Sequence, residues 1–149
     1  RMMMLSMQGQ WPHVVNFLLY LAAALPLLGI GVWLFARLTP YKEGELLHNG
    51  AQDGMAGRAA EAAAHDLGGK LLGLTLVLAS AIFHSVHIWD LLFWGAVGIV
   101  SQVVVAKLFE RVTPYRVSQE IPKGNVAVGI FSARLSVAAG LLLAALISY

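Results

Sequence analysis

Four apolar blocks dominate this 149-residue sequence and decide what it can fold into. About 20 helical residues cross the hydrocarbon core of a bilayer, and each block reaches about this length, the second only when the helix-forming residues before it are added. With the helix-forming residues that extend the second and third, the blocks cover residues 14–35, 59–83, 91–109 and 126–147. The sequence therefore predicts an all-α integral membrane protein with four transmembrane helices.

The composition also favours a membrane location. Charged residues make up 12% of the chain, about half of the roughly 25% found in soluble domains. Cysteine is absent, which excludes disulfides, thiolate metal sites and a cysteine nucleophile. The cations are scattered rather than clustered on one face, so we expect no nucleic acid partner. The first block exceeds the about 7–15 apolar residues of a signal peptide, and we expect it to be retained.

Lysine and arginine residues predict the orientation of the helices, because the cytoplasmic flanks of membrane spans are rich in them. None lies between His84 and Asp90, whereas the segments after the first and third spans carry many. With their flanks, these two segments contain Arg37, Lys42, Arg58, Lys70, Lys107, Arg111, Arg116 and Lys123. We therefore predict that loops 38–65 and 110–125 are cytoplasmic and that both termini lie outside.

A nine-residue motif occurs twice, as LFARLTPYK over 34–42 and LFERVTPYR over 108–116, with six identical positions. One interpretation is a helix end with a membrane anchor, because proline stops the helix while arginine and tyrosine suit the interface. The other is a docking or anion-binding surface formed by the paired cations. The motif residues are Arg37, Thr39, Pro40, Tyr41 and Lys42, and Arg111, Thr113, Pro114, Tyr115 and Arg116.

The duplicated motif predicts an internal repeat. We expect one membrane domain, 1–149, built from two parallel helical hairpins over 13–86 and 87–149, the first with an enlarged cytoplasmic loop over 43–65. An offset of 64 in the later part aligns Lys70 with Arg134, which places a cation at the same depth in both halves.

The segments TPYKEGELL, GGKLLGLTLVLASAI, TPYR and KGNVAVGIFSARLSVAAGLLLAA follow one another in an order that resembles the domain of unknown function 350 family. The resemblance covers residues 16–149. It implies a small bacterial inner (plasma) membrane protein with a link to envelope or stress function. It brings no established catalytic residues and no cofactor, and the long loop AQDGMAGRAAEAA over 51–63 departs from it.

Lys70 and Arg134 are the two cations expected inside the membrane. They act either as anchors at the inner interface or as the lining of an anion path, or they pair with a carboxylate such as Asp66 or Glu120. Asp66 precedes Lys70 by one helical turn and is a favourable partner. The carboxylates of the first cytoplasmic segment are expected to form a solvated face; they are Glu43, Glu45, Glu61 and Asp66.

Further polar residues are candidates for the lining of a path through the membrane, and for Ser101 and Gln102 in the third span the alternative is hydrogen bonding between helices. The candidates are His13, Asn16, His87, Asp90, Ser101 and Gln102. The spacing His84, His87 and Asp90 offers possible metal ligands, but it spreads them around a helix, so no metal site is predicted. No catalytic motif occurs, and no enzyme activity is expected.

Two functional hypotheses follow from the sequence. The first is a non-enzymatic, oligomeric structural or partner-docking subunit, most simply a dimer, in contact with the lipid bilayer and with a cytoplasmic or membrane protein partner. The alternative is a small-ion channel or transporter in which the polar groups of both repeats line a path.

Overall fold

The computed structural model describes residues 2–114 and 116–147, and all regular structure in this part of the chain is helical. In chain order the elements are α1 (Met2–Leu38), α2 (Glu43–Leu47), α3 (Met55–His84), α4 (Ile88–Val112), α5 (Val117–Glu120) and α6 (Val126–Leu146). The part of α1 over Gln8–Leu38, and α3, α4 and α6, are long and apolar enough to cross a membrane. The predicted class, an all-α membrane protein with four spanning helices, is confirmed.

Helices α1, α3 and α4 are longer than the corresponding apolar blocks, and α6 matches its block to within one residue. Helix α1 continues through Pro12 and Pro26. Helix α3 begins at Met55 because its alanine-rich start favours helix, so much of the segment expected as a loop over 43–65 is helical. The order of a long, a short and a long helix occurs twice along the chain, while a symmetry between the two halves stays a prediction.

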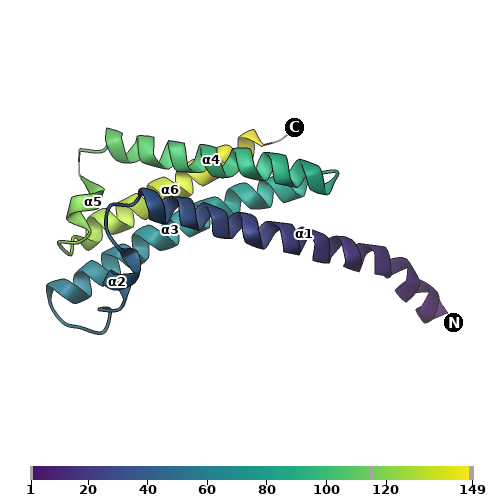
Figure 1. Cartoon of the computed structure of the whole chain (residues 1–149), viewed down its shortest axis with the longest axis horizontal. Coiled ribbons are helices and arrows are strands. Elements are labelled where there is room, and N and C mark those ends of the chain that lie inside the picture. Colours follow the sequence, from purple (N-terminus) through teal and green to yellow (C-terminus); the bar gives the residue numbers. More distant parts are fainter. Residues whose placement is uncertain (1, 115, 148–149) are drawn as a thin grey trace.

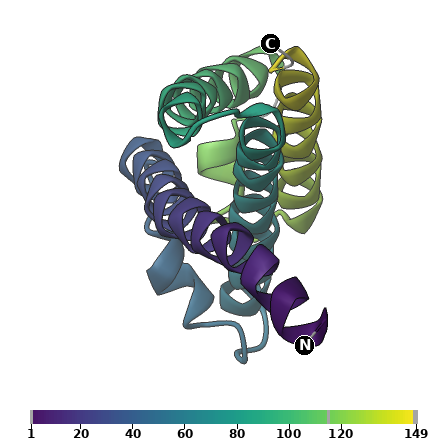
Figure 2. The same ribbon diagram turned by 90° about the vertical axis from the view of Figure 1, so that its right-hand side faces the viewer.

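Helix α3 is the centre of the bundle. It packs against α1, α4 and α6, and its most extensive contact is with α6, which runs beside it in the same direction (Figures 1 and 2). The short helices α2 and α5 lie at the end of the bundle opposite the N-terminus (Figure 1). The first part of α1 extends away from the other helices, and its side chains over 8–19 are exposed (Figure 1).

Small residues allow α3 and α6 to approach closely. A Cβ atom at Gly69 would lie 2.3 Å from the Cα of Ala133, and one at Gly73 would lie 2.5 Å from the carbonyl oxygen of Ser136. A Cβ at Gly140 would lie 2.7 Å from the Cα of Gly73. Membrane helices commonly associate through such small residues, and this close contact brings the polar side chains of α3 within reach of α6.

Candidate functional site

A group of polar side chains is buried where α3 meets α6 and the segment that follows α1. At its centre Asp66 and Lys70 form an ion pair, with 2.8 Å between Asp66 Oδ2 and Lys70 Nζ, and their side chains are 0% and 2% exposed. We call this group the ion cluster; its members are Thr39, Tyr41, Glu43, Asp66, Lys70 and Ser132.

The Asp66 carboxylate receives hydrogen bonds from three parts of the chain. Lys70 donates from the same helix, Ser132 Oγ of α6 donates to Oδ1 over 2.6 Å, and the Tyr41 hydroxyl donates to Oδ2. A buried carboxylate is stable only when its oxygens are paired. The ion cluster therefore ties α3 to α6 and to the segment after α1.

The Lys70 ammonium group is enclosed in the same way. Its Nζ donates to Thr39 Oγ1 over 3.2 Å, and the Thr39 hydroxyl in turn donates to the Phe35 carbonyl over 2.7 Å. Glu43 Oε1 lies 3.6 Å from Lys70 Nζ, and the Phe35 ring centroid lies 5.6 Å away. These contacts surround the cation with two carboxylates, a hydroxyl and an aromatic face.

Glu43 and Tyr41 lie outside the four spans, and both have a raised pKa. Burial raises the pKa of the Glu43 carboxyl above its ordinary value, and the nearby Lys70 cation offsets only part of this effect. Burial and the neighbouring Asp66 raise the pKa of the Tyr41 hydroxyl, which keeps it a hydrogen-bond donor. The arrangement can therefore neutralise charge inside the bundle and hold a proton at Glu43.

The expectation of a solvated carboxylate face is wrong for Glu43 and Asp66, which are 8% and 0% exposed. Both are buried because Lys70 compensates for the loss of water. Glu45 and Glu61 are exposed as expected. The spacing of Asp66 and Lys70 predicted their pairing, whereas no pattern in the sequence indicated that Glu43 and Ser132 join them, because their partners lie on other elements.

Arg134 lies in a different environment from Lys70. Its side chain is exposed on α6, and no hydrogen bond or ion pair joins it to another residue within the described ranges. The residue one turn before it is Ile130, whereas the residue one turn before Lys70 is Asp66. The candidate partner Glu120 instead accepts a hydrogen bond from Asn125.

The first copy of the repeated motif folds partly inward. Helix α1 ends at Leu38, and Thr39 and Tyr41 belong to the ion cluster. The other motif residues of this copy remain at the surface. Arg37 lies over the Trp33 ring at 5.3 Å, Pro40 is exposed, and Lys42 forms an exposed ion pair with Glu45 at 3.5 Å.

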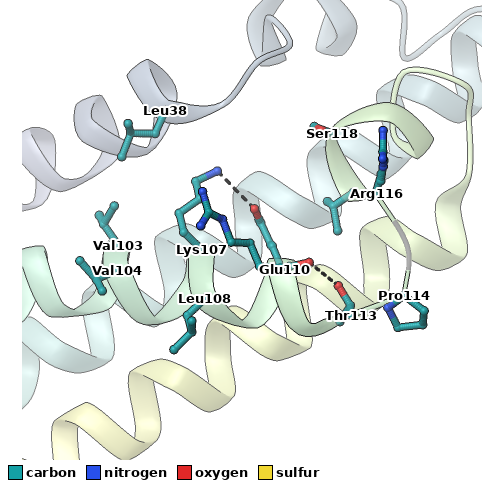
Figure 3. A pocket seen from close by; sticks show the side chains of 12 residues that line it. Leu38, Val103, Val104, Lys107, Leu108, Glu110, Thr113, Pro114, Arg116 and Ser118 are labelled. Atoms are coloured by element: carbon teal, nitrogen blue, oxygen red, sulfur yellow. Dashed lines mark hydrogen bonds and ion pairs between the residues drawn. The ribbon is translucent and has the colours of Figure 1, made fainter.

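The second copy of the motif borders an open pocket. Arg111, Thr113, Pro114 and Arg116 contribute to its lining, and Thr113 Oγ1 donates to the Glu110 carbonyl over 2.7 Å (Figure 3). Tyr115, which the sequence also assigned to this motif, lies outside the described residues. The two copies therefore have different surroundings despite their similar sequences.

The opposite end of the bundle holds three of the five histidines, His13, His84 and His87. His13 and Asn16 of α1 line a second pocket of about 380 Å³ together with Tyr20 and Ser85, and neither His87 nor Asp90 contributes to it. The Asp90 carboxylate caps the start of α4, where it accepts hydrogen bonds from the backbone N–H groups of Val86 and His87 at 3.1 Å each.

The candidate metal ligands His84, His87 and Asp90 are not arranged as a metal site. The His84 ring nitrogen Nδ1 lies 2.9 Å from the Ser80 carbonyl at the end of α3. Among the described residues no group of three or more histidine, aspartate or glutamate side chains could hold a metal ion.

Ser101 and Gln102 lie in the middle of α4. Gln102 is fully buried, and its Nε2 donates to the Ser136 carbonyl of α6 over 2.8 Å, which is a helix-to-helix hydrogen bond. Ser101 is half-buried beside it. Of the two interpretations for Gln102, the geometry matches the hydrogen bond between helices.

These features define a class of protein: a small integral membrane protein with four spanning helices and an ion pair buried between them. The family described as Domain of Unknown Function (DUF350) matches residues 7–147, and the chain belongs to this family.

Two relatives are similar along almost their whole length. The chain is 28% identical over 143 residues to the UPF0719 inner membrane protein YjfL of Escherichia coli strain K12, covering 92% of this chain and 99% of the relative. It is 29% identical over 141 residues to the UPF0719 transmembrane protein YshE of Bacillus subtilis strain 168, covering 93% and 98%. No solved structure matches the chain.

Proposed function

We propose that the protein is a non-enzymatic subunit of a bacterial inner membrane assembly and that it functions as a homo-oligomer, most simply a dimer. The observation that carries this proposal is Arg134, a cation exposed on the surface of a membrane-spanning helix. Ionisable residues in membrane spans usually face protein or water, because lipid cannot solvate them.

The position of Arg134 along α6 determines the free-energy cost of placing this cation in the membrane. It lies eight residues after Val126 and twelve before Leu146, or about 12 Å and 18 Å from the two ends at ~1.5 Å per residue. A cation at the centre of a span costs about 2.5–3.5 kcal/mol on insertion scales. Extension of the side chain toward the headgroups recovers part of this cost, and contact with a neighbouring chain removes the stem of the side chain from lipid.

The exposed face of α6 has the spacing of a contact between helices. Exposed residues recur at alternating steps of four and three, and we call them the α6 seam: Ala127, Phe131, Arg134, Ala138, Leu141 and Ala145. This is the heptad spacing of packed helix pairs, and its alanines permit close approach. A second copy related by a two-fold axis along the membrane normal packs one seam against the other. The two Arg134 side chains then lie at the same level, and both extend toward the headgroups, which keeps their like charges apart.

Paired alanine substitutions test the assembly. Ala138 lies on the α6 seam, whereas Ala96 is an exposed alanine on α4. We expect native mass spectrometry in mild detergent to detect a dimer that Ala138→Phe disrupts and Ala96→Phe preserves. A wild-type chain that remains monomeric in several detergents and in lipid nanodiscs would contradict the proposal.

The same proposal includes an orientation in the inner membrane, which is where the name of the E. coli relative places that protein. The basic loops 38–65 and 110–125 face the cytoplasm and both termini face outward, because lysine and arginine favour the cytoplasmic side. Cysteines introduced at Gln52 and Lys123 are then protected from an impermeant thiol reagent in intact cells, and one at Val86 reacts. The opposite labelling pattern would invert the orientation.

We further propose that the basic inner edge docks a protein partner. Arg37 and Lys42 are exposed in the first motif copy, and Arg111 and Arg116 in the second. A stoichiometric partner should co-purify from native membranes, and charge-reversing substitutions at Arg37 and Lys42 should release it. Purification of the chain with no stoichiometric partner would leave only the homo-oligomer.

A small-ion channel or transporter is the second candidate. One observation favours it: the ion cluster holds a carboxyl group of raised pKa, that of Glu43, beside Lys70 inside the bundle. Purified protein in liposomes should then conduct protons or small ions, and Glu43→Gln should alter the flux while leaving the oligomer intact. Flux no greater than that of empty vesicles would exclude this candidate.

A further inference from the structure

We propose that the pocket beside the second motif copy binds one anionic phospholipid, with the phosphate at its cationic end and the acyl chains along its apolar end. The pocket has a volume of about 780 Å³ and lies between the end of α1, the last turns of α4 and the segment of α5 (Figure 3). Its size is within the range of about 300–1,000 Å³ that is common for small-molecule sites.

The pocket is polarised along the direction of the helices. Leu38 of α1 and Val104 and Leu108 of α4 form its apolar side, and they are 52%, 58% and 55% exposed. These residues belong to two candidate spans. Lys107 lies between Val104 and Leu108, whereas the two arginines lie further along the chain, Arg111 in the last turn of α4 and Arg116 beyond it. From the membrane interior toward the interface, an apolar wall followed by cations matches the order of acyl chain and phosphate in a phospholipid.

The charge of the lining is suited to an anion. Lys107, Arg111 and Arg116 face one carboxylate, that of Glu110, so the net formal charge of these four is +2. Glu110 engages Lys107, with 3.3 Å between Glu110 Oε2 and Lys107 Nζ (Figure 3). Arg111 and Arg116 have no ion pair with any residue that the structure describes, and arginine binds phosphate through two parallel hydrogen bonds.

The apolar wall favours a phospholipid over a free phosphate ion as the ligand of the pocket. A free phosphate ion would satisfy the arginines but would leave Leu38, Val104 and Leu108 uncovered, whereas a phospholipid covers both parts of the pocket. The first motif copy offers no such site, because Thr39 and Tyr41 turn inward to the ion cluster. Of the two copies, the second is therefore the one assigned to lipid.

The test compares two lipids of equal chain length on the full-length protein in mild detergent. We expect phosphatidylglycerol to remain bound in native mass spectrometry and to raise the unfolding temperature, and phosphatidylcholine to do neither. The double variant Arg111→Gln/Arg116→Gln should lose at least tenfold in affinity for phosphatidylglycerol. The matched control Arg37→Gln/Lys42→Gln removes the cations of the first copy and should bind as the wild type does.

Three results would overturn the inference. Equal affinity for the two lipids would show that the pocket does not select lipids by the charge of the headgroup. An equal thermal shift with inorganic phosphate would show a free-anion site. Wild-type affinity in the double variant would place the lipid elsewhere. If the double variant does not fold, Arg116→Gln alone decides, because Arg116 lies beyond the end of α4.

Discussion

The two halves of the chain carry a cation at aligned positions, and the comparison of Lys70 with Arg134 is informative. Lys70 is buried among two carboxylates and a hydroxyl, whereas Arg134 lies on the surface of α6. The first half supplies Asp66 one turn before its cation, and the second half has Ile130 there. Similar sequences therefore contain two different cations. The charge of Lys70 is neutralised within the chain, whereas the charge of Arg134 is exposed.

The difference extends to the segments after the repeated motif. Glu43 follows the first copy and joins the ion cluster, and the aligned residue after the second copy is Val117, which packs in an apolar cluster with Ala62 and Ile121. The first half therefore supplies all the charged members of the ion cluster. The cation of the second half at the aligned position, Arg134, is exposed, and we place a contact with another chain there.

The largest expected effect is the loss of Lys70. Lys70→Gln leaves Asp66 without its counter-ion in a site that excludes water, and breaking a buried pair costs about 3–5 kcal/mol. Arg134→Gln should change the unfolding free energy by about 0.5 kcal/mol or less, because it removes an exposed charge. Denaturant unfolding in a detergent that keeps the chain monomeric measures both values. Equal losses would erase the distinction between the two halves.

The next effect concerns the contact that brings Ser132 to Asp66. A Cβ at Gly73 would meet Gln102 Nε2 at 2.4 Å, whereas a Cβ at Gly68, on the outer face of α3, has nothing within 4 Å. Gly73→Ala should therefore cost about 1–3 kcal/mol through overpacking, and Gly68→Ala should be neutral or stabilising. Thermal unfolding of the two variants checks this, and similar stabilities would mean that the α3–α6 contact is looser than described.

A smaller effect should depend on pH and involves Glu43. Its folded-state pKa is raised by burial, so the folded chain binds the proton more tightly than the unfolded chain does. This contribution to stability is complete below the ordinary carboxyl pKa of about 4.3 and is lost as the pH rises through the folded-state pKa. Glu43→Gln mimics the protonated group, so its free energy of unfolding relative to that of the wild type should rise by about 1 kcal/mol between acid and neutral pH.

The control for the pH experiment is Glu45→Gln, since Glu45 is an exposed neighbour on the same short helix. Unfolding curves collected across the pH range should show no comparable change for this variant. A Glu43→Gln variant whose stability follows that of the wild type at every pH would mean that Glu43 does not titrate in the folded chain.

The smallest effect should arise from giving Arg134 a partner. Ile130→Asp places a carboxylate one turn before Arg134, as Asp66 stands before Lys70. An i,i+4 pair contributes about 0.2–0.5 kcal/mol in a helix, so this variant should be more stable than the neutral match Ile130→Asn by that amount. The advantage should disappear when Arg134→Gln is added. An unchanged advantage in that background would exclude the pair as its cause.

Much of the fold could be predicted from the sequence, because apolar blocks report membrane spans directly. The Asp66–Lys70 pair could be predicted as well, since residues four apart face the same side of a helix. The burial of Glu43 and Tyr41 could not, because helical periodicity does not say which element covers a given face. The repeat predicted the depth of Arg134 but not whether its side chain faces the bundle interior or the surface. The presence of Ile130 where the first half has Asp66 did indicate a cation without a carboxylate one turn before it.

The hydrogen bond from Ser132 to Asp66 has a consequence for biosynthesis. The ribosome completes α3 well before it reaches α6, so α3 must enter the bilayer without the Ser132 hydroxyl. During that interval Asp66 and Lys70 can neutralise each other within a single turn, which spares the nascent helix an uncompensated charge. Insertion of the last span then closes the bundle, and a chain that is truncated before Val126 should reach the membrane but remain open to proteolysis.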